Sequence, residues 1–78
     1  MGKHQVKRRN LKKLKAFGNH LKEIRVAKNM TQEQLADKAS VSEYTIVTLE
    51  SGKLNTSLPT CFAIAKALGI SPLDLFDF

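Results

Sequence analysis

The chain has 78 residues, a formal net charge of +6 and a single cysteine, Cys61. A chain of this length forms one small domain with one hydrophobic core, and a lone cysteine excludes an intramolecular disulfide and a multi-cysteine zinc site. The longest fully apolar run, residues 61–65, is too short for a signal sequence or a membrane span. We therefore expect a soluble intracellular protein.

The positive charge is concentrated at the N-terminus. Residues 1–15 contain seven Lys or Arg residues and no acidic residue (+7), whereas residues 16–78 contain six basic and seven acidic residues (−1). This asymmetry indicates a polyanionic partner that meets the N-terminus, with a solubilising tail as the alternative. Because the first nine residues show no apolar period, we expect residues 1–10 to form a disordered basic arm and residues 11–78 to form the folded domain.

The first expected helix covers residues 11–28. Its apolar residues recur every three or four positions, at Leu11, Leu14, Phe17, Leu21 and Ile24. Asn10 can cap the start of this helix, and Asn29 can take the left-handed conformation that ends it. Gly18 weakens a helix by about 1 kcal/mol relative to alanine, so order can begin nearer Phe17.

Two short helices are expected next, over residues 32–39 and 43–51. Thr31 and Gln34 form a capping box at the start of the first, and Ser42 caps the second. Helices of about eight residues are marginal by themselves, so both need to pack against the rest of the chain.

Two further helices complete the expected fold. Ser57 caps a helix over residues 58–68 with Pro59 in its first turn, and Ser71 caps a helix over residues 72–77. The sequence shows no alternating strand pattern and no internal repeat. It therefore predicts an all-α fold, a compact bundle of five helices.

The two short helices and the segment after them carry a recognisable pattern. Its elements are Thr31-Gln32-Glu33-Gln34-Leu35-Ala36, Val41-Ser42, Ile46, Leu49-Glu50-Ser51-Gly52-Lys53 and Ala63-Ile64-Ala65-Lys66-Ala67-Leu68-Gly69-Ile70-Ser71. This pattern, which covers about residues 17–76, resembles the phage-repressor and Cro-like (XRE-type) helix-turn-helix family. Small stand-alone repressors and the controller proteins of restriction–modification systems are similar. The resemblance implies a repressor-like fold in a cytoplasmic protein of prokaryotic or phage origin.

The resemblance also implies roles for particular residues, since the third helix of this fold enters the major groove of DNA. The implied base-reading residues are Glu43, Tyr44, Thr45 and Thr48. The implied phosphate contacts are Gln32, Ser51, Lys53, Asn55 and Thr56. The alternative for Gln32 is a polar surface residue that favours the helix, and for the residues after the third helix it is a solvated loop, except that the charge of Lys53 favours contact. The basic arm would add DNA contacts through Lys3, Lys7, Arg8 and Arg9.

Three positions depart from the family pattern. Glu43 stands where a neutral polar residue is common, and its alternative role is to stabilise the helix N-terminus. Ser40 stands where the turn usually has glycine, at a cost of about 1–2 kcal/mol if that position needs a positive φ. Thr56 stands where the family often has proline.

Two further roles follow from the resemblance. Arg25 of the first helix and Glu50 at the end of the third are expected to form a structural ion pair. The last helix often mediates dimerisation in this family. We expect Leu73 and Phe76 to close the core, and an apolar patch to remain exposed as a homodimer interface. Its residues would be Ile64, Leu75 and Phe78, with core closure without dimerisation as the alternative.

These observations predict a sequence-specific regulator of transcription that binds double-stranded DNA as a homodimer on an inverted-repeat operator. The alternative is an antitoxin-like or adaptor module that binds an unidentified protein partner, with secondary DNA binding. Glu43 and the nearly neutral body favour that alternative, and an RNA-binding role is weaker because exposed aromatic stacking residues are lacking. We expect no enzyme activity, because no catalytic motif is present, and neither cofactor nor metal, because His4 and His20 lack partner ligands.

Overall fold

The computed structural model describes the backbone of residues 3–53 and 56–78, and the side chains in these ranges from Leu11 onward. Five α-helices make up this part of the chain and no strand occurs in it. They are α1 (Lys3–Ala27), α2 (Gln32–Ala39), α3 (Glu43–Glu50), α4 (Leu58–Leu68) and α5 (Pro72–Leu75). The predicted all-α fold of five helices is confirmed.

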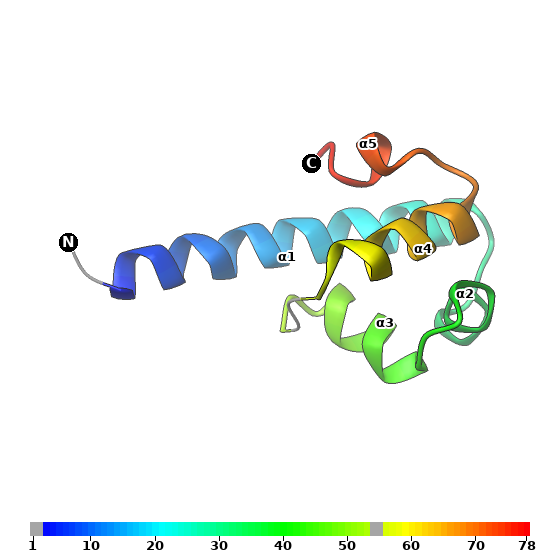
Figure 1. Cartoon of the computed structure of the whole chain (residues 1–78), viewed down its shortest axis with the longest axis horizontal. Coiled ribbons are helices and arrows are strands. Elements are labelled where there is room, and N and C mark those ends of the chain that lie inside the picture. The colour runs from blue at the N-terminus through cyan, green and yellow to red at the C-terminus, as the bar shows by residue number, and fades with distance from the viewer. Residues whose placement is uncertain (1–2, 54–55) are drawn as a thin grey trace.

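The helices are arranged around α1 (Figure 1). α1 packs on α3 and α5, α2 packs on α3 and α4, and α4 packs on α5. In Figure 1 α2 and α3 lie below α1, whereas α5 and the C-terminus lie above it, and the N-terminal part of α1 extends beyond the other helices. The α2–α3 pair and the C-terminal segment therefore occupy opposite sides of the molecule.

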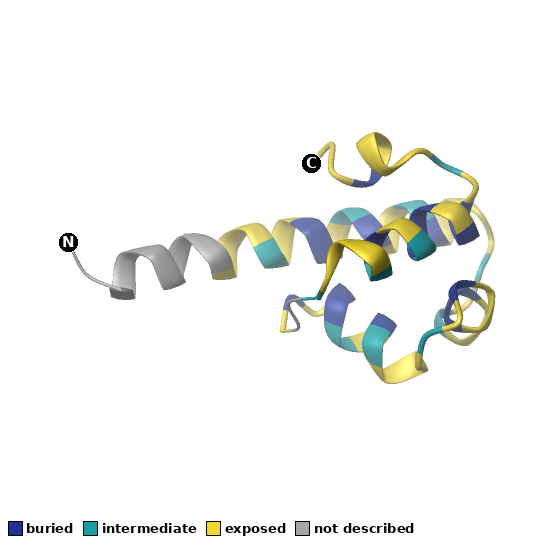
Figure 2. Ribbon diagram, viewed as in Figure 1, coloured by how far each residue is buried: buried dark blue, intermediate teal, exposed yellow. Residues whose placement is uncertain are grey.

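The hydrophobic core receives side chains from every helix (Figure 2). Its most completely buried members are Leu21, Leu35, Ile46, Leu49, Ile64 and Leu75. Met30, Val41 and Ile70, which each precede a helix cap, pack against this core, as a hydrophobic staple requires. The expectation that Ile64 and Leu75 stay exposed is wrong, because both face the core with 0% of their surface accessible. Leu73 is 82% exposed and does not close the core.

The helix ends have the predicted chemistry. The Gln34 amide donates to Thr31 Oγ1 at 3.0 Å, and the Thr31 amide donates to Gln34 Oε1 at 2.9 Å, which completes the capping box. Asn29 and Ser40 adopt positive φ angles of 57° and 58°. The turn between α2 and α3 therefore does require a left-handed residue, and Ser40 takes that conformation at the expected cost of about 1–2 kcal/mol.

The first helix starts earlier than the sequence pattern predicts. It begins at Lys3 rather than Leu11, and Asn10 lies inside it instead of capping it. Extending an existing helix gains one hydrogen bond for each residue whose backbone is fixed, whereas starting a new helix is costly. A helix can therefore be extended without an apolar face on the added residues. No glycine or proline interrupts residues 3–17, and the helix continues through the basic segment. The N-terminal segment expected to be disordered is thus largely a continuation of α1.

At Gly18 the backbones of α1 and α3 approach each other closely. A Cβ atom at Gly18 would clash with the carbonyl oxygen of Leu49 and lie 2.7 Å from that of Glu50. Gly18 is buried at this contact, so a residue without a side chain is needed here even though glycine weakens a helix. The absence of a side chain at Gly18 lets the C-terminal end of α3 rest directly on α1.

The predicted ion pair between Arg25 and Glu50 is confirmed, and it joins three helices. Arg25 Nε donates to Glu50 Oε2 at 2.6 Å and Arg25 Nη2 donates to Glu50 Oε1 at 3.0 Å. Arg25 Nη1 also donates to the Met30 carbonyl at 2.7 Å, and Gln32 Nε2 donates to Glu50 Oε1 at 3.1 Å. The hydrogen bond to Glu50 raises the pKa of the Arg25 guanidinium, although burial acts to lower it. This buried network fixes α1, the turn after it, α2 and α3 together.

Replacement of Arg25 by alanine should destabilise the fold severely. The change leaves the Glu50 carboxylate, on a residue only 8% exposed, without its charged partner, which typically costs about 3–5 kcal/mol. In a domain of this size each kcal/mol lowers the melting temperature by about 4–8 °C. The thermal melt should therefore shift strongly downward, and an unchanged melt would contradict the account. The double variant Arg25→Met/Glu50→Leu is the control, since an apolar pair should recover much of the loss.

Gly18→Ala should also lower stability, although alanine is the better helix former. The gain in helix propensity of about 1 kcal/mol is outweighed by the cost of separating α1 from α3, typically about 1–3 kcal/mol for an overpacked site. Urea unfolding should give a lower midpoint for Gly18→Ala than for the wild type. The neighbouring exposed position supplies the control, because Asn19→Ala should keep or raise the midpoint. A higher midpoint for Gly18→Ala would disprove the close crossing.

Candidate nucleic-acid interface

The N-terminal half of α3 presents polar side chains to solvent while its opposite side is buried. Ser42 caps the helix by accepting a hydrogen bond from the Thr45 amide at 3.1 Å. Glu43 and Tyr44 follow in the first turn, and Tyr44 is 72% exposed. Ile46 on the other side is completely buried. This one-sided burial holds Glu43 and Tyr44 outward on a helix that the core fixes in place.

The two threonines predicted to read bases already use their hydroxyl groups within α3. Thr48 Oγ1 donates to the Tyr44 carbonyl at 2.7 Å, and Thr45 Oγ1 lies 2.9 Å from Ser42 Oγ. Both residues are half-buried. A threonine in this state keeps its methyl group and acceptor lone pairs for an external partner. Thr48 can therefore still offer the methyl contact that suits a thymine.

Gln32 is the first residue of α2, beside the unpaired amides of that helix N-terminus. One N–H of its side-chain amide donates to Glu50, which leaves the second N–H and the carbonyl oxygen for other partners. The bond to Glu50 restricts the side chain to one arrangement. Gln32 is thus oriented by the same network that anchors α3, a link that the sequence pattern alone did not reveal.

The segment after α3 contains further residues predicted to contact phosphates. Ser51 and Lys53 are exposed, and Thr56 is half-buried. Ser51, the C-cap residue of α3, donates a hydrogen bond from Oγ to the Thr48 carbonyl at 2.9 Å. Asn55 lies outside the described residues, as do the side chains of Lys3, Lys7, Arg8 and Arg9, whose backbone belongs to α1.

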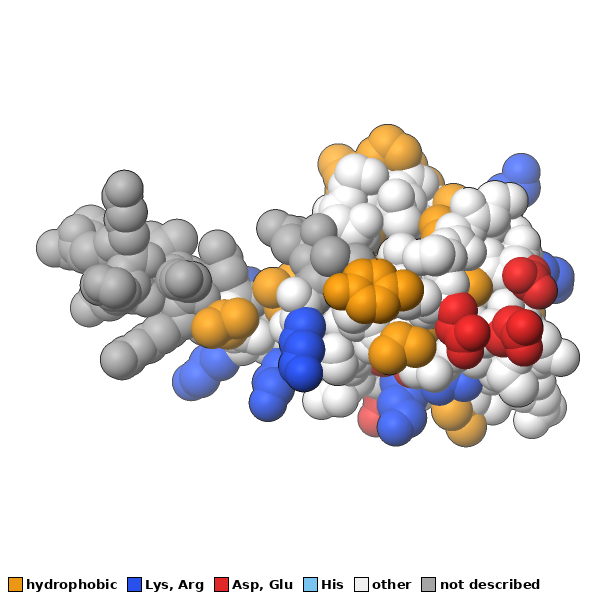
Figure 3. All heavy atoms as spheres, turned by 90° about the horizontal axis from the view of Figure 1, so that it is seen from below, with side chains coloured by type: hydrophobic (Ala, Val, Ile, Leu, Met, Phe, Trp, Pro, Cys, Tyr) orange, Lys and Arg blue, Asp and Glu red, His pale blue; other side chains and the backbone are white. Residues whose placement is uncertain are grey.

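Charge is divided along this face. Figure 3 views the molecule from the side of α2 and α3: Asp and Glu side chains gather toward the end far from the N-terminus, with Lys or Arg side chains beside them, whereas toward the N-terminal part of α1 the charged side chains are Lys and Arg. The acidic residues of α2 are Glu33 and Asp37, both exposed, and Glu43 follows at the start of α3. The end of the face nearest the N-terminal part of α1 is therefore the one suited to a polyanion.

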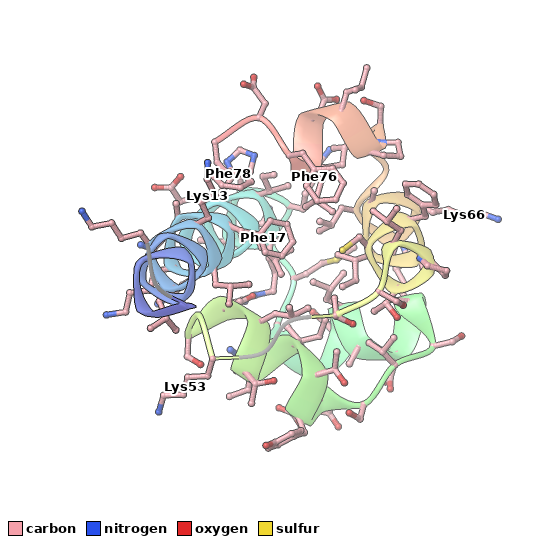
Figure 4. The ribbon with its side chains drawn as sticks, turned by 60° about the vertical axis from the view of Figure 1, so that its left-hand side comes forward. Lys13, Phe17, Lys53, Lys66, Phe76 and Phe78 are labelled. Carbon is pink, nitrogen blue, oxygen red and sulfur yellow. The ribbon has the colours of Figure 1, made fainter. Side chains whose placement is uncertain are left out.

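Apolar side chains are also exposed along α4 and the C-terminal segment. These residues are Leu58, Phe62, Leu73, Phe76 and Phe78. Figure 4 shows that Phe76 and Phe78 both lie against Phe17, and each ring centroid is 5.8 Å from that of Phe17. His20 Nε2 also donates to the Asp74 carbonyl at 2.8 Å. The C-terminal segment is thus held on α1, with part of its apolar surface facing solvent.

No metal or membrane site emerges from the described residues. They contain no group of three His, Cys, Asp or Glu side chains placed to hold a metal ion. None of the helices in these residues combines the length and the apolar character needed to cross a membrane. Cys61 is buried, and this burial raises the pKa of its thiol, which disfavours the reactive thiolate.

Comparisons with known proteins agree with this geometry. Residues 21–75 match the helix-turn-helix family. A transcriptional regulator of the helix-turn-helix type from Methanocaldococcus jannaschii is 47% identical over 60 residues, which cover 77% of this chain and 91% of that protein. The control protein C.BamHI of Bacillus amyloliquefaciens is 43% identical over 63 residues, which cover 80% of this chain and 78% of that protein.

The fold is also shared with a solved structure. The restriction-modification controller protein C.AhdI from Aeromonas hydrophila superposes with a TM-score of 0.79 at 38% sequence identity, covering 81% of this chain and 96% of that one. The family match, these relatives and the arrangement of α2 and α3 all indicate a helix-turn-helix protein. The chain belongs to the helix-turn-helix family and is a DNA-binding transcriptional regulator.

Proposed function

We propose that this regulator recognises a specific double-stranded DNA sequence by placing the N-terminal half of α3 in the major groove. The observation that carries the proposal is the outward position of Glu43 and Tyr44 on a helix whose other side is buried. Glu43 can accept a hydrogen bond from a cytosine amino group, and the Thr48 methyl can contact a thymine. Tyr44 supplies both a ring and a hydroxyl group, and Thr45 lies beside it. The protein would act in the cytoplasm of a prokaryotic cell.

Phosphate contacts would flank these base contacts. Gln32 can donate its free amide N–H to a phosphate, and the positive end of the α2 dipole favours an anion at the same place. On the other side of α3, Ser51, Lys53 and Thr56 can reach the backbone of the duplex, and Asn55 is proposed with them. The basic N-terminal residues Lys3, Lys7, Arg8 and Arg9 add contacts that do not depend on sequence.

We further propose a homodimer. Its interface would be formed by the exposed apolar residues of α4 and the C-terminal segment, and not by Ile64 and Leu75, which are buried in the core. Exposed large apolar side chains grouped on one side of a small domain favour an interface. A two-fold axis there would pair like surfaces and leave both α3 helices free, because α5 and α3 lie on opposite sides of the molecule (Figure 1). Such a dimer suits an inverted-repeat operator with half-sites about 34 Å apart.

Substitution of Tyr44 should change which sequences are bound. Selection from a randomised duplex pool of about 30 base pairs should enrich two half-sites one helical turn apart for the wild type. Tyr44→Ala should relax the preference at one position of each half-site, with a loss of about 1–3 kcal/mol of discrimination. Tyr44→Phe keeps the ring and removes the hydroxyl, so it separates packing from hydrogen bonding. An unchanged consensus for Tyr44→Ala would refute base reading by this residue.

Leu73→Lys should weaken the dimer without unfolding the chain, because Leu73 is 82% exposed and a lysine there is solvated. Sedimentation velocity should show the wild type as a dimer and Leu73→Lys shifted toward the monomer. Val26→Lys is the matched control, since Val26 is also exposed (55%) but lies on α1. A monomeric wild type at operator-saturating concentrations would contradict the homodimer and favour a different protein partner for this surface.

A further inference from the structure

A group of lysines beside the C-terminal end of α3 is separate from the residues that face the bases. Lys12 and Lys15 of α1 and Lys53 after α3 are exposed, and they line one hollow on the surface. The same hollow is completed by Leu11, Ser51 and Gly52. We call Lys12, Lys15 and Lys53 the basic ridge. Figure 4 labels Lys53, whose side chain projects outward from the turn after α3.

The position of the basic ridge is fixed by a close backbone contact. A Cβ atom at Gly52 would lie 2.7 Å from Lys15 Cγ and 2.9 Å from Lys15 Cα. Gly52 also has a φ of +77°, a conformation that favours glycine, and its amide donates to the Leu49 carbonyl at 3.1 Å. The turn that ends α3 therefore rests against α1 at Lys15. This contact gives Lys15 a defined position relative to the C-terminal end of α3.

The charges of the basic ridge have no acidic counterpart in the described part of the chain. None of its lysines lies within 4.0 Å of a described carboxylate, since the salt bridge found there joins Arg25 and Glu50. Like charges around one hollow repel one another, and a polyanion bound across them would offset that repulsion. Lys13 and Lys66 are not part of this group. In Figure 4 Lys13 lies on the Phe78 side of α1, and Lys66 projects from α4 on the far side from Lys53.

The basic ridge continues into the part of α1 that extends beyond the body of the molecule. From Lys15 back to Lys3 the helix rises about 18 Å, which corresponds to about five base-pair steps of duplex DNA. The sequence of this part contains four more basic residues, Lys3, Lys7, Arg8 and Arg9. The backbone of these four residues belongs to α1, so they follow one another along a helix.

We propose that the basic ridge and the N-terminal part of α1 bind the phosphate backbone of duplex DNA outside the half-site that α3 reads. This inference rests on the proposed function, because α3 must lie in the groove for α1 to reach the flanking backbone. The lysines of α1 neutralise phosphates beyond the outer edge of each half-site, and Lys53 joins them to the contacts made at the end of α3. The N-terminal part of α1 thus lengthens the DNA footprint without adding sequence preference.

The test compares two double variants that each lose two positive charges, Lys12→Gln/Lys15→Gln and Lys13→Gln/Lys66→Gln. Fluorescence anisotropy gives the affinity between 50 and 200 mM KCl for two probes, the selected operator and a random-sequence duplex of equal length. Loss of two phosphate contacts in each protomer lowers the salt slope by about 1.8 per protomer, or about 3.6 for the proposed dimer, so the affinity change over this range shrinks about 150-fold. The Lys13/Lys66 control should keep a slope close to that of the wild type. Circular dichroism confirms that each variant is folded.

A second comparison varies the length of the operator. The wild type should bind an operator trimmed at the outer edges of its half-sites more weakly than one with about five further base pairs on each side. The Lys12→Gln/Lys15→Gln variant should lose most of that difference. Equal salt slopes for the two double variants would overturn the proposed role of the basic ridge, as would wild-type affinity that does not depend on flank length. Either result would leave the proposal of sequence-specific binding intact. Salt-dependent binding of both probes with no preference for the operator would overturn the proposed function instead.

Discussion

The buried ion pair between Arg25 and Glu50 is the interaction on which the rest of this structure depends. A domain of this size has a small core, and two of its helices are too short to persist alone. Glu50 ends α3, Arg25 comes from α1, and Gln32 opens α2, so one carboxylate connects the elements that form the helix-turn-helix. Such a pair adds little net stability relative to an apolar pair, but its loss leaves a buried charge. We infer that its value lies in orientation: it sets the angle of α3 and the position of Gln32 together.

The surface of the molecule has three parts of different chemical character. The face of α2 and α3 presents polar side chains from rigid helices, which suits contact with base edges and phosphates. The C-terminal segment lies on the opposite side, where Phe17 holds Phe76 and Phe78 on α1, and α4 exposes further apolar residues between the two sides. The N-terminal part of α1 extends away from both and carries charge. Because α5 and the C-terminus lie away from α2 and α3, the proposed homodimer would leave α3 accessible for the proposed DNA contact.

Sequence reasoning predicted the helices, their caps, the left-handed Asn29 and Ser40 and the Arg25–Glu50 pair, because each depends on local chemistry or on a recurrent pattern. It failed where the outcome depended on three-dimensional packing. The sequence shows Gly18 only as a residue that weakens a helix. The structure shows that glycine is required there because the carbonyl groups of α3 leave no room for a side chain. Ile64 and Leu75 were expected outside because periodicity does not show which neighbour covers an apolar face. Helix elongation into a basic segment leaves no apolar signal, so the start at Lys3 was missed.

The most direct measurement is an amide NMR titration of the isotope-labelled protein with its selected operator duplex. The account predicts the largest chemical-shift changes in residues 43–48 of α3 and at Gln32, with small changes on the exposed side of α4. That pattern would place the polar face of α2 and α3 on the DNA. Largest changes on α4 and the C-terminal segment, with α3 unaffected, would contradict the central claim that the outward half of α3 reads the operator.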